Sequence, residues 1–392
     1  TFNTRTKGFM LHVTKTGTGN GTVTPSIGVL NFNGNMAMTQ YPEGSQVILK
    51  GVPADGSGFI AWTGCDQAIG SQCTVNMTAE KVVAVEFSSD GKKPKKDFDG
   101  DGKSDIFWRN AKTGDVVVWL MNAAGISQGS YVVRGMPADW EVKAIGDFNG
   151  DGKSDVLWQN TNNGDVYIWL MDSAKINGGD YPVKGIPRDW EFRAAGDFDG
   201  DGKTDVLWQN ANNGDVAVWF MDGARINRGD FVLKGLPADW MLKAVADLNN
   251  DGKDDMVWQG ANGDVYVWLM DGVKITGGGY AAKGIPGNWQ VKAAGDFDGD
   301  GKTDVLWQDT QSGDVAMWLM DGSTVLGGNY VVRGMPGNWQ VLTTGDFNGD
   351  GKVDVLWQDT ATGDIYVWLM DGIKIFGGGF ATKALELDWW TK

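Results

Sequence analysis

A nine-residue motif recurs six times along the chain, and this periodicity constrains the fold more than any other feature. The motif reads Asp-Phe-Asp-Gly-Asp-Gly-Lys-Ser-Asp in its first copy. Its six copies begin at Asp97, Asp147, Asp197, Asp247, Asp296 and Asp346. The copies are 50 residues apart, except for one step of 49 residues where a residue is missing from a turn. A regular period of this length is typical of repeat architectures.

Each repeat contains four short segments with strand character. In the second copy we predict strands at residues 140–145, 154–159, 165–171 and 181–183, separated by turns rich in Gly, Asn and Pro. No segment of the repeat has the apolar period of a helix. Four strands in about 50 residues is the size of one β-propeller blade.

The third predicted strand favours a propeller over simpler sheets. In the second copy it reads Val-Tyr-Ile-Trp-Leu-Met over residues 166–171, which is apolar on both faces. A propeller blade packs between two neighbours and buries both faces, whereas an isolated antiparallel sheet has one wet face. A linear β-solenoid is the main alternative, but its repeats are usually shorter and have fewer strands.

The two ends of the repeat region complement each other. The first copy lacks the leading strand and has Lys-Lys-Pro-Lys-Lys at residues 92–96 instead. Residues 387–392, at the end of the chain, align with residues 337–342, where the leading strand of the sixth copy begins. We therefore predict an all-β chain with a six-bladed β-propeller of four-stranded blades over residues 97–392. Its C-terminal strand is expected to complete the first blade and close the ring.

Residues 1–90 are interpreted as a separate, small β-rich domain. Short strands are predicted at residues 13–24, 46–50, 59–63, 73–77 and 82–87. Residues 91–96 are interpreted as a basic linker. A solvated linker is favoured over one that binds an anionic surface, because the rest of the chain is acidic.

The two cysteines indicate the cellular compartment. Cys65 and Cys73 lie close together in the N-terminal domain, and we expect them to form a disulfide, as in an oxidising environment. Two free thiols in a cytosolic domain are the alternative. No signal peptide is visible at Thr1, so we expect a processed form. No apolar stretch is long enough to predict a transmembrane segment.

The charge of the chain is strongly negative and unevenly distributed. The formal net charge is -16, and from Asp97 onward there are 44 acidic and only 25 basic side chains. A surface this acidic repels phosphate backbones, so we do not expect nucleic acid as a partner.

The repeated motif has the spacing of a calcium loop. Calcium takes six to eight oxygen ligands, and carboxylates at positions 1, 3 and 5 of a tight loop converge on one point. Gly at position 6 permits the sharp turn, the carbonyl at position 7 can face inward, and Asp at position 9 is expected to complete the shell in bidentate fashion. Position 12 is Trp108 in the first copy, inside a predicted strand, so the loop is not an EF-hand.

The predicted calcium ligands are the side chains at positions 1, 3, 5 and 9 and the carbonyl at position 7. They are Asp97, Asp99, Asp101, Lys103, Asp105; Asp147, Asn149, Asp151, Lys153, Asp155; Asp197, Asp199, Asp201, Lys203, Asp205; Asp247, Asn249, Asp251, Lys253, Asp255; Asp296, Asp298, Asp300, Lys302, Asp304; and Asp346, Asn348, Asp350, Lys352, Asp354. The fourth loop departs most from the others, with Leu248, Asn250 and Asp254 at positions 2, 4 and 8.

Metal-free turns rich in Asp and Gly are the alternative to calcium loops. The four side-chain positions place 21 carboxylates in six clusters, which would repel one another strongly without a cation. About six Ca²⁺ ions would change the formal charge from -16 to -4. Calcium therefore accounts for the acidity of the repeats better than metal-free turns do.

The six Asp-x-[Asp/Asn]-x-Asp-Gly-x-x-Asp loops, each followed by a strand similar to Val-Leu-Trp-Gln, resemble the FG-GAP or VCBS repeats of secreted and cell-surface propellers. In that family the loop aspartates bind calcium, which implies the same for the aspartates named above. Residues 17–24, 59–65 and 82–87 resemble the internalin-B-repeat-like domain of bacteria. This second resemblance implies a small β module of an exported bacterial protein, with no activity attached.

The sequence offers little for catalysis. The one histidine, His12, lies outside the repeats, and neither cysteine has a nearby His partner in the sequence. No nucleophile elbow, phosphate loop or zinc cluster is present. A glycosidase pair should break the symmetry of the repeats, and only Glu191 and Asp254 do so, without an evident partner. We therefore do not expect an enzyme.

Tryptophan forms three repeating columns that contain 18 of the 20 tryptophans. The columns that include Trp108 and Trp119 lie inside strands and are expected in the core. The third column follows turns at the entry to the leading strand: Trp140, Trp190, Trp240, Trp289, Trp339 and Trp389. An Asp or Asn precedes each, so these aromatics at one rim could stack on sugars beside a polar partner. Packing between blades is the alternative, and it is favoured.

These observations favour a secreted or cell-surface bacterial protein that binds an extracellular glycan or protein surface without catalysis. Glycan is the leading expectation, through six equivalent weak sites acting together. A structural subunit of an extracellular matrix or filament is the second possibility, and a carbohydrate-active enzyme the third. The fold alone does not choose among them, because propellers have many functions.

Overall fold

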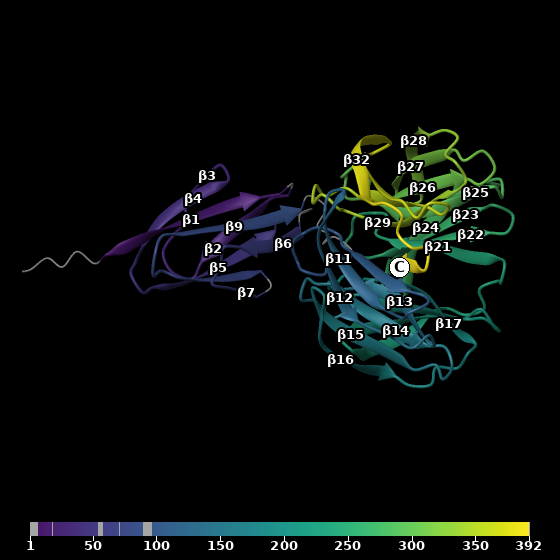
Figure 1. Ribbon diagram of the computed structural model, residues 1–392, viewed down its shortest axis with the longest axis horizontal. Coiled ribbons are helices and arrows are strands. Elements are labelled where there is room, and N and C mark those ends of the chain that lie inside the picture. Colours follow the sequence, from purple (N-terminus) through teal and green to yellow (C-terminus); the bar gives the residue numbers. More distant parts are fainter. Residues whose placement is uncertain (1–6, 18, 54–57, 70, 89–95, 392) are drawn as a thin grey trace, which may run out of the picture. The chain divides into compact units, whose positions relative to one another are not determined.

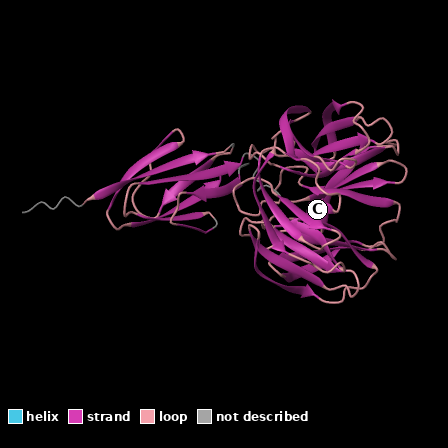
Figure 2. Ribbon diagram, in the orientation of Figure 1, coloured by secondary structure: helices cyan, strands magenta, loops and turns pink. Residues whose placement is uncertain are grey.

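The computed structural model describes residues 7–17, 19–53, 58–69, 71–88 and 96–391. The chain forms two compact units, one mainly from Thr1–Lys93 and the other mainly from Lys103–Lys392. Within the described ranges the chain is all β, and strands and loops account for it without a helix (Figure 2). No helix in this part of the chain is long and apolar enough to cross a membrane.

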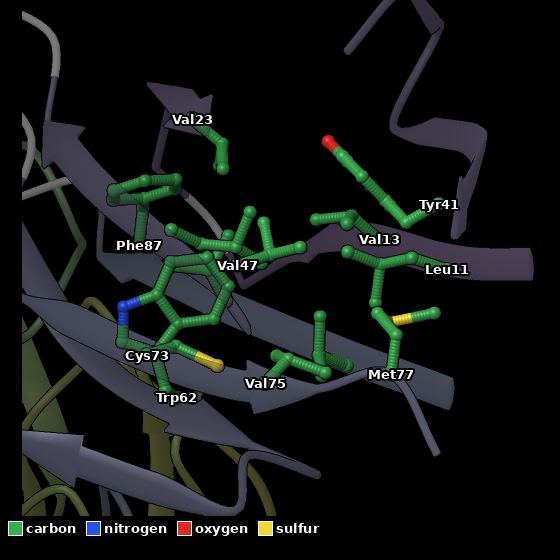
Figure 3. Packing of buried hydrophobic residues seen from close by; sticks show 13 residues of the cluster. Leu11, Val13, Val23, Tyr41, Val47, Trp62, Cys73, Val75, Met77 and Phe87 are labelled. Atoms are coloured by element: carbon green, nitrogen blue, oxygen red, sulfur yellow. The ribbon is translucent and has the colours of Figure 1, made fainter. Parts of the chain in front are cut away.

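The N-terminal unit has two sheets. The first has the strand order β3 (Phe32–Asn33), β4 (Met36–Pro42), β1 (Gly8–Thr16), β9 (Lys81–Ser88) and β6 (Gly58–Thr63). The second has the order β2 (Gly21–Pro25), β5 (Gln46–Pro53), β8 (Gln72–Asn76) and β7 (Gln67–Ile69). Alternating residues of both sheets bury their side chains in one core, which includes Leu11, Val47, Val75 and Phe87 (Figure 3).

The N-terminal prediction was right in its fold class and wrong in some elements. The predicted strand at residues 13–24 is two strands, β1 and β2, in different sheets. Gly17 ends β1 with φ +84°, and a Cβ there would lie 2.4 Å from the carbonyl oxygen of Phe87. β4 was missed, and the predicted linker lies outside the described residues except Lys96. The expected disulfide between Cys65 and Cys73 is confirmed, with Cα atoms 5.6 Å apart.

The second unit consists of six four-stranded antiparallel sheets among its described residues, which we call blades 1 to 6 (Figure 1). Blade 1 contains β12 (Gly125–Val133), β11 (Val116–Asn122), β10 (Ile106–Asn110) and β33 (Trp389–Thr391). Blade 2 contains β13 (Trp140–Gly146), β14 (Asp155–Asn160), β15 (Val166–Asp172) and β16 (Lys175–Val183). Blade 3 contains β17 (Trp190–Gly196), β18 (Asp205–Asn210), β19 (Val216–Asp222) and β20 (Arg225–Leu233).

The remaining blades follow the same order. Blade 4 contains β21 (Trp240–Ala246), β22 (Asp255–Gly260), β23 (Val265–Asp271) and β24 (Lys274–Ala282). Blade 5 contains β25 (Trp289–Gly295), β26 (Asp304–Asp309), β27 (Val315–Asp321) and β28 (Thr324–Val332). Blade 6 contains β29 (Trp339–Gly345), β30 (Asp354–Asp359), β31 (Ile365–Asp371) and β32 (Lys374–Thr382). Repeated four-stranded blades of this kind are a β-propeller architecture.

The last strand of each complete blade is longer than the sequence indicated. In blade 2 the prediction was residues 181–183, whereas β16 begins at Lys175 and includes the Gly pair that was read as a turn. The glycines are needed for close packing: in blade 3 a Cβ at Gly229 would lie 2.9 Å from the Cδ1 atom of Trp219 on the paired strand. Gly therefore marks an approach of an indole ring here and not a break in the strand.

The fourth strand of blade 1 comes from the far end of the described chain. β33 pairs antiparallel with β10, and Trp108 lies opposite Thr391. The amide of Ala111 also donates to the carbonyl of Asp388 at 2.7 Å. The pairing is the one that the sequence alignment of the two ends predicted.

Apolar clusters lie between consecutive blades. Leu207 and Val218 of blade 3, for example, share one buried cluster with Met256 and Trp258 of blade 4. A further cluster joins blade 6 to blade 1, because it contains residues of β10, β11, β30 and β31. Both faces of the middle strands are thus covered, which explains their continuous apolar sequences.

Candidate functional site

The six Asp-rich motifs form tight loops directly before the second strand of each blade; we call them loops 1 to 6. In loop 2 the carboxylate of Asp147 accepts hydrogen bonds from the amides of Gly150 (2.7 Å) and Gly152 (2.8 Å). Asp151 accepts one from the amide of Lys153 at 2.9 Å. These bonds wind the backbone around the side chains. In loop 4, Asn250 replaces Gly at position 4 and keeps the left-handed conformation, with φ +61°.

Three loops bring carboxylates close enough to share one cation. Their oxygen atoms lie within 4.8 Å of one another in the groups Asp97, Asp99, Asp101; Asp197, Asp199, Asp205; and Asp296, Asp298, Asp300. Two ligands of one calcium ion, each at about 2.3–2.6 Å, are at most about 5 Å apart. The donor sets of loops 1, 3 and 5 therefore fit Ca²⁺ in chemistry and in spacing.

Loops 2, 4 and 6 are arranged differently because their third residue is Asn. In loop 2 the amide nitrogen of Asn149 donates to the carboxylate of Asp151 at 3.0 Å, and its oxygen accepts from the Asp151 backbone at 2.9 Å. Asn249 and Asn348 make the same side-chain bonds, at 3.1 and 2.9 Å. The structure thus separates two kinds of loop among the six that the sequence predicted as calcium sites.

The position 9 aspartates have a structural role that the sequence did not reveal. One oxygen of Asp155 accepts the amide of Phe148 (3.0 Å) and the other accepts the amide of Met171 (2.9 Å). Equivalent pairs of bonds hold Asp105, Asp205, Asp255, Asp304 and Asp354. This side chain therefore ties its loop to the third strand of the blade. Of the six, Asp205 is also in one of the three carboxylate groups.

Burial sets the protonation of these aspartates. It raises the pKa of the Asp155 carboxyl to about 8, and the nearby carboxylates of Asp151 and Asp147 add to the rise, against the two backbone hydrogen bonds. The same causes raise the pKa of Asp205 to about 8 and that of Asp255 to about 7. A cation in the loop would favour the ionised form of each group.

Backbone hydrogen bonds link each loop to the one before it. The amide at position 8 of one loop donates to the carbonyl at position 1 of the preceding loop. The six bonds are Ser154 to Asp97, Thr204 to Asp147, Asp254 to Asp197, Thr303 to Asp247, Val353 to Asp296 and Ser104 to Asp346, at 2.6–3.0 Å. Loop 1 is therefore connected to loop 6 as well as to loop 2.

The lysine at position 7 and the two acids that break the symmetry of the repeats, Glu191 and Asp254, all contact other residues of the propeller. Lys203 pairs with Asp222 at 2.8 Å, so its ammonium group turns to the end of the third strand. Glu191 pairs with Arg193 at 2.8 Å. Asp254, in loop 4, accepts the amide of Asp197 at 3.0 Å. Glu191 therefore takes part in an ion pair, and Asp254 takes part in a hydrogen bond between loops 3 and 4.

The first tryptophan column is buried, as predicted, whereas the second column is buried in blades 2, 4 and 6 and half-buried in blades 1, 3 and 5. The indole rings of Trp108, Trp158, Trp208, Trp258, Trp307 and Trp357 are at most 2% exposed. Each packs against the second-column tryptophan of its blade, with ring centroids 4.6–5.0 Å apart. The indole nitrogen of all six first-column residues has no hydrogen-bond partner.

The third column is half-buried and packs against the clusters between blades. The polar residues before it are largely occupied. Asp139 accepts a hydrogen bond from the side chain of Asn160 at 2.8 Å, and Asp189 accepts one from Asn210 at 2.9 Å. These residues therefore hold the turn to the second strand, rather than standing free beside the aromatic ring as the sequence suggested.

In the part of the chain that the structure describes, three pockets open beside third-column tryptophans, and each of the three is lined by one tryptophan from every column. The pocket of blade 5 has a volume of about 450 Å³ and is lined by Trp289, Trp307, Trp318 and Tyr330. That of blade 3 also has about 450 Å³, and that of blade 1 about 260 Å³. The corresponding lining residues are Trp190, Trp208, Trp219 and Phe231 in blade 3, and Trp389, Trp108, Trp119 and Tyr131 in blade 1.

His12 lies in the N-terminal unit, where its Nε2 atom is 3.1 Å from a carboxylate oxygen of Glu80 at the surface.

The chain is distantly similar to several solved structures. Raptor of Chaetomium thermophilum is 8% identical, with a TM-score of 0.41 over 68% of this chain and 23% of its own. An oligogalacturonate lyase is 9% identical, with a TM-score of 0.41 over 72% and 84%. The Tc holotoxin pore of Photorhabdus luminescens is 13% identical, with a TM-score of 0.45 over 86% and 16%. Likenesses this weak carry no argument about function, and the chain spans under a quarter of Raptor.

No curated protein matches the chain. The profile of the divergent InlB B-repeat domain matches residues 11–91. The profile of the FG-GAP-like repeat matches residues 97–158, 147–208, 247–307 and 296–357, which together cover more than half of the chain. With its repeated Asp-rich loops and four-stranded blades, the chain belongs to the FG-GAP-like repeat family.

Proposed function

We propose that this protein is a noncatalytic binding module that acts outside the cell, in which calcium stabilises a closed six-bladed ring and the aromatic rim binds glycan. The observation that carries the binding role is the set of pockets with three tryptophans each. Tryptophan presents a large flat apolar face with a polar edge, which suits the mixed surface of a sugar.

Calcium would be held by the carboxylates of loops 1, 3 and 5, and by the oxygen atoms of the Asn-containing loops at lower charge. Bound calcium supplies charge neutralisation, which removes the repulsion within each carboxylate group. The chain's own part is to hold the loops in shape, through the position 9 aspartates and the bonds between neighbouring loops. Ring closure is supported by the pairing of β33 with β10 and by the apolar cluster between blades 6 and 1.

A location outside the cell is supported by the disulfide, since such bonds persist in oxidising compartments. The match to a divergent InlB B-repeat domain supports a bacterial surface or secreted protein. A rim with repeated weak sites, each of about millimolar affinity or about 4 kcal/mol, would bind a multivalent surface much more strongly than a single sugar.

A glycan array probed with and without calcium tests the proposal. Binding should depend on calcium and should fall steeply in Trp190→Ala/Trp289→Ala, whose residues line pockets. Trp140→Ala/Trp240→Ala is the matched control from the same column. No signal on any glycan, together with assembly that grows with protein concentration, would instead favour a structural subunit. Turnover of a glycan would contradict the noncatalytic role.

A further inference from the structure

One position in the third strand alternates between large and small residues around the propeller. It is occupied by Val117, Tyr167, Ala217, Tyr266, Ala316 and Tyr366 in blades 1 to 6. Each of these residues lies directly opposite the first-column tryptophan of its blade, as Ala217 does opposite Trp208. Directly opposed residues share one face of an antiparallel pair, so this side chain borders the indole ring.

In the even blades the tyrosine occupies the space beside the indole. The ring of Tyr167 packs edge-on against Tyr181, with centroids 4.6 Å apart, and Tyr266 against Tyr280 at 4.8 Å. Tyr366 meets Phe380 in the same way at 4.8 Å. The second-column tryptophans of these blades are accordingly buried, at 7–8% exposure.

In the odd blades the small residue leaves the space open. The three pockets lie in blades 1, 3 and 5, and Val117, Ala217 and Ala316 line them. Their volume follows the side chain, because the blades with Ala have about 450 Å³ and the blade with Val has about 260 Å³. The second-column residues Trp119, Trp219 and Trp318 are half-buried there, not buried.

Each open pocket also offers one polar side chain to a ligand. The unpaired indole nitrogens do not distinguish these pockets, because those of all six first-column tryptophans are buried and without a hydrogen-bond partner. Ser130, Asp230 and Asn329 add one oxygen-bearing side chain to the pockets of blades 1, 3 and 5.

We propose that blades 1, 3 and 5 each bind one neutral sugar residue in these pockets, so that the ring carries three ligand sites and not six. The C–H face of the pyranose lies on indole, and a sugar hydroxyl donates to Ser130, Asp230 or Asn329. Asp230 and the net charge of -16 disfavour uronic and sialic acids. This inference rests on the proposed glycan binding and specifies its sites.

Position 3 of the Asp-rich loops alternates around the propeller in the same way, with Asp in the odd blades and Asn in the even blades. The repeating unit is therefore a pair of blades. The three carboxylate groups are in loops 1, 3 and 5, in the blades with open pockets, whereas the Asn-containing loops belong to the blades filled by tyrosine. Two independent positions therefore divide the six blades into the same two sets.

Swapping residues between the two sets tests the proposal. Calcium-loaded crystals of the whole chain would be soaked with methyl glycosides of neutral sugars, and saturation-transfer NMR would follow the same glycosides in solution. The wild type should hold sugar in blades 1, 3 and 5. Ala217→Tyr, which copies blades 2 and 4, should empty blade 3 and leave two sites, and Tyr266→Ala should open a fourth site in blade 4. The melting temperature and its calcium dependence check that each variant is folded.

Sugar in the even blades of the wild type, or unchanged occupancy of blade 3 in Ala217→Tyr, would overturn the three-site inference. If Ala217→Tyr does not fold, Tyr266→Ala provides an independent test, because the absence of a fourth sugar site in blade 4 of that variant would also overturn the three-site inference. Empty pockets with a positive glycan array would reject these sites but leave glycan binding standing. Empty pockets with a silent array would reject both.

Discussion

At the scale of a single residue, the position 9 aspartate joins the Asp-rich loop, the second strand and the third strand of its blade. Asp155 accepts amides from loop 2 and from β15 while it is fully buried. Asp155→Ala removes both acceptors and leaves two buried N–H groups unpaired, so we expect a loss of about 2–6 kcal/mol in the free energy of unfolding. Denaturant unfolding in EDTA measures this loss without any contribution from metal.

The matched control is Asp172→Ala in the same blade. The side chain of Asp172 is half-exposed and pairs with Lys153, and a surface pair of this kind contributes at most about 1 kcal/mol. Equal losses in the two variants would mean that Asp155 does not tie the loop to the strand.

Buried carboxyls also give the metal-free protein an unusual pH dependence. Burial raises the pKa of Asp105, Asp155, Asp205, Asp304 and Asp354 to about 8, from an ordinary value of 3.8. The folded state then holds more protons than the unfolded state between these values, so stability falls as the pH rises from about 4 to about 8. In EDTA the melting temperature should drop across this range. Calcium should raise it most at high pH, and a metal-free protein that becomes more stable from pH 5 to pH 8 would contradict this expectation.

At the scale of elements, much of the fold could be predicted because the same physical pattern repeats six times. The apolar middle strands, the Asp-Gly turns and the missing first strand of blade 1 are all visible in the sequence. The extent of β16 was not, because Gly178 and Gly179 suggest a turn. In the structure they pair with β15, and a Cβ at Gly179 would lie 2.3 Å from the carbonyl oxygen of Ile168. The bonds between loops were also hidden, since they involve backbone atoms of residues about 50 positions apart.

The candidate sites were predicted in part for similar reasons. Carboxylate spacing within nine residues is local, so the sequence could identify the loops. The pockets depend on Ala217 and Ala316 lying opposite tryptophans of another strand, and this register appears only in the structure. The alternation of Ala and Tyr is visible in the sequence, but only the strand register shows that these residues lie beside the first-column tryptophans.

The pairing of β33 with β10 leads to a prediction at the scale of elements. Arg109 stands where the other blades have Gln, and its guanidinium lies 5.9 Å from the ring centre of Trp390. Removal of residues 387–392 exposes the edge of β10 and part of the cluster between blades 6 and 1. We expect a lower melting temperature and self-association through the free edge, measured by light scattering. A truncated chain that stays monomeric with unchanged melting would mean that the ends do not close a ring, and removal of Lys392 alone is the control.

At the scale of the whole molecule, the six Asp-rich loops are linked to one another by backbone hydrogen bonds, and together they contain much of the negative charge of the chain. Carboxylate count tunes the affinity of a calcium site, so loops 1, 3 and 5 should bind more tightly than the Asn-containing loops. Each site that is occupied at 100 times its Kd adds about 2.7 kcal/mol to stability. Calcium should therefore control the stability of the propeller.

Native mass spectrometry during a calcium titration, paired with melting curves in calcium and in EDTA, tests the calcium-stabilised ring most directly. We expect about three ions to bind first, with up to about six at high calcium, and a large fall in melting temperature on addition of EDTA. Asp199→Asn gives loop 3 the residue that loop 2 has at position 3. In this variant we expect two ions to bind tightly instead of three, and the ion of loop 3 to bind only at high calcium. A chain that binds no calcium and melts at the same temperature in EDTA would contradict the account.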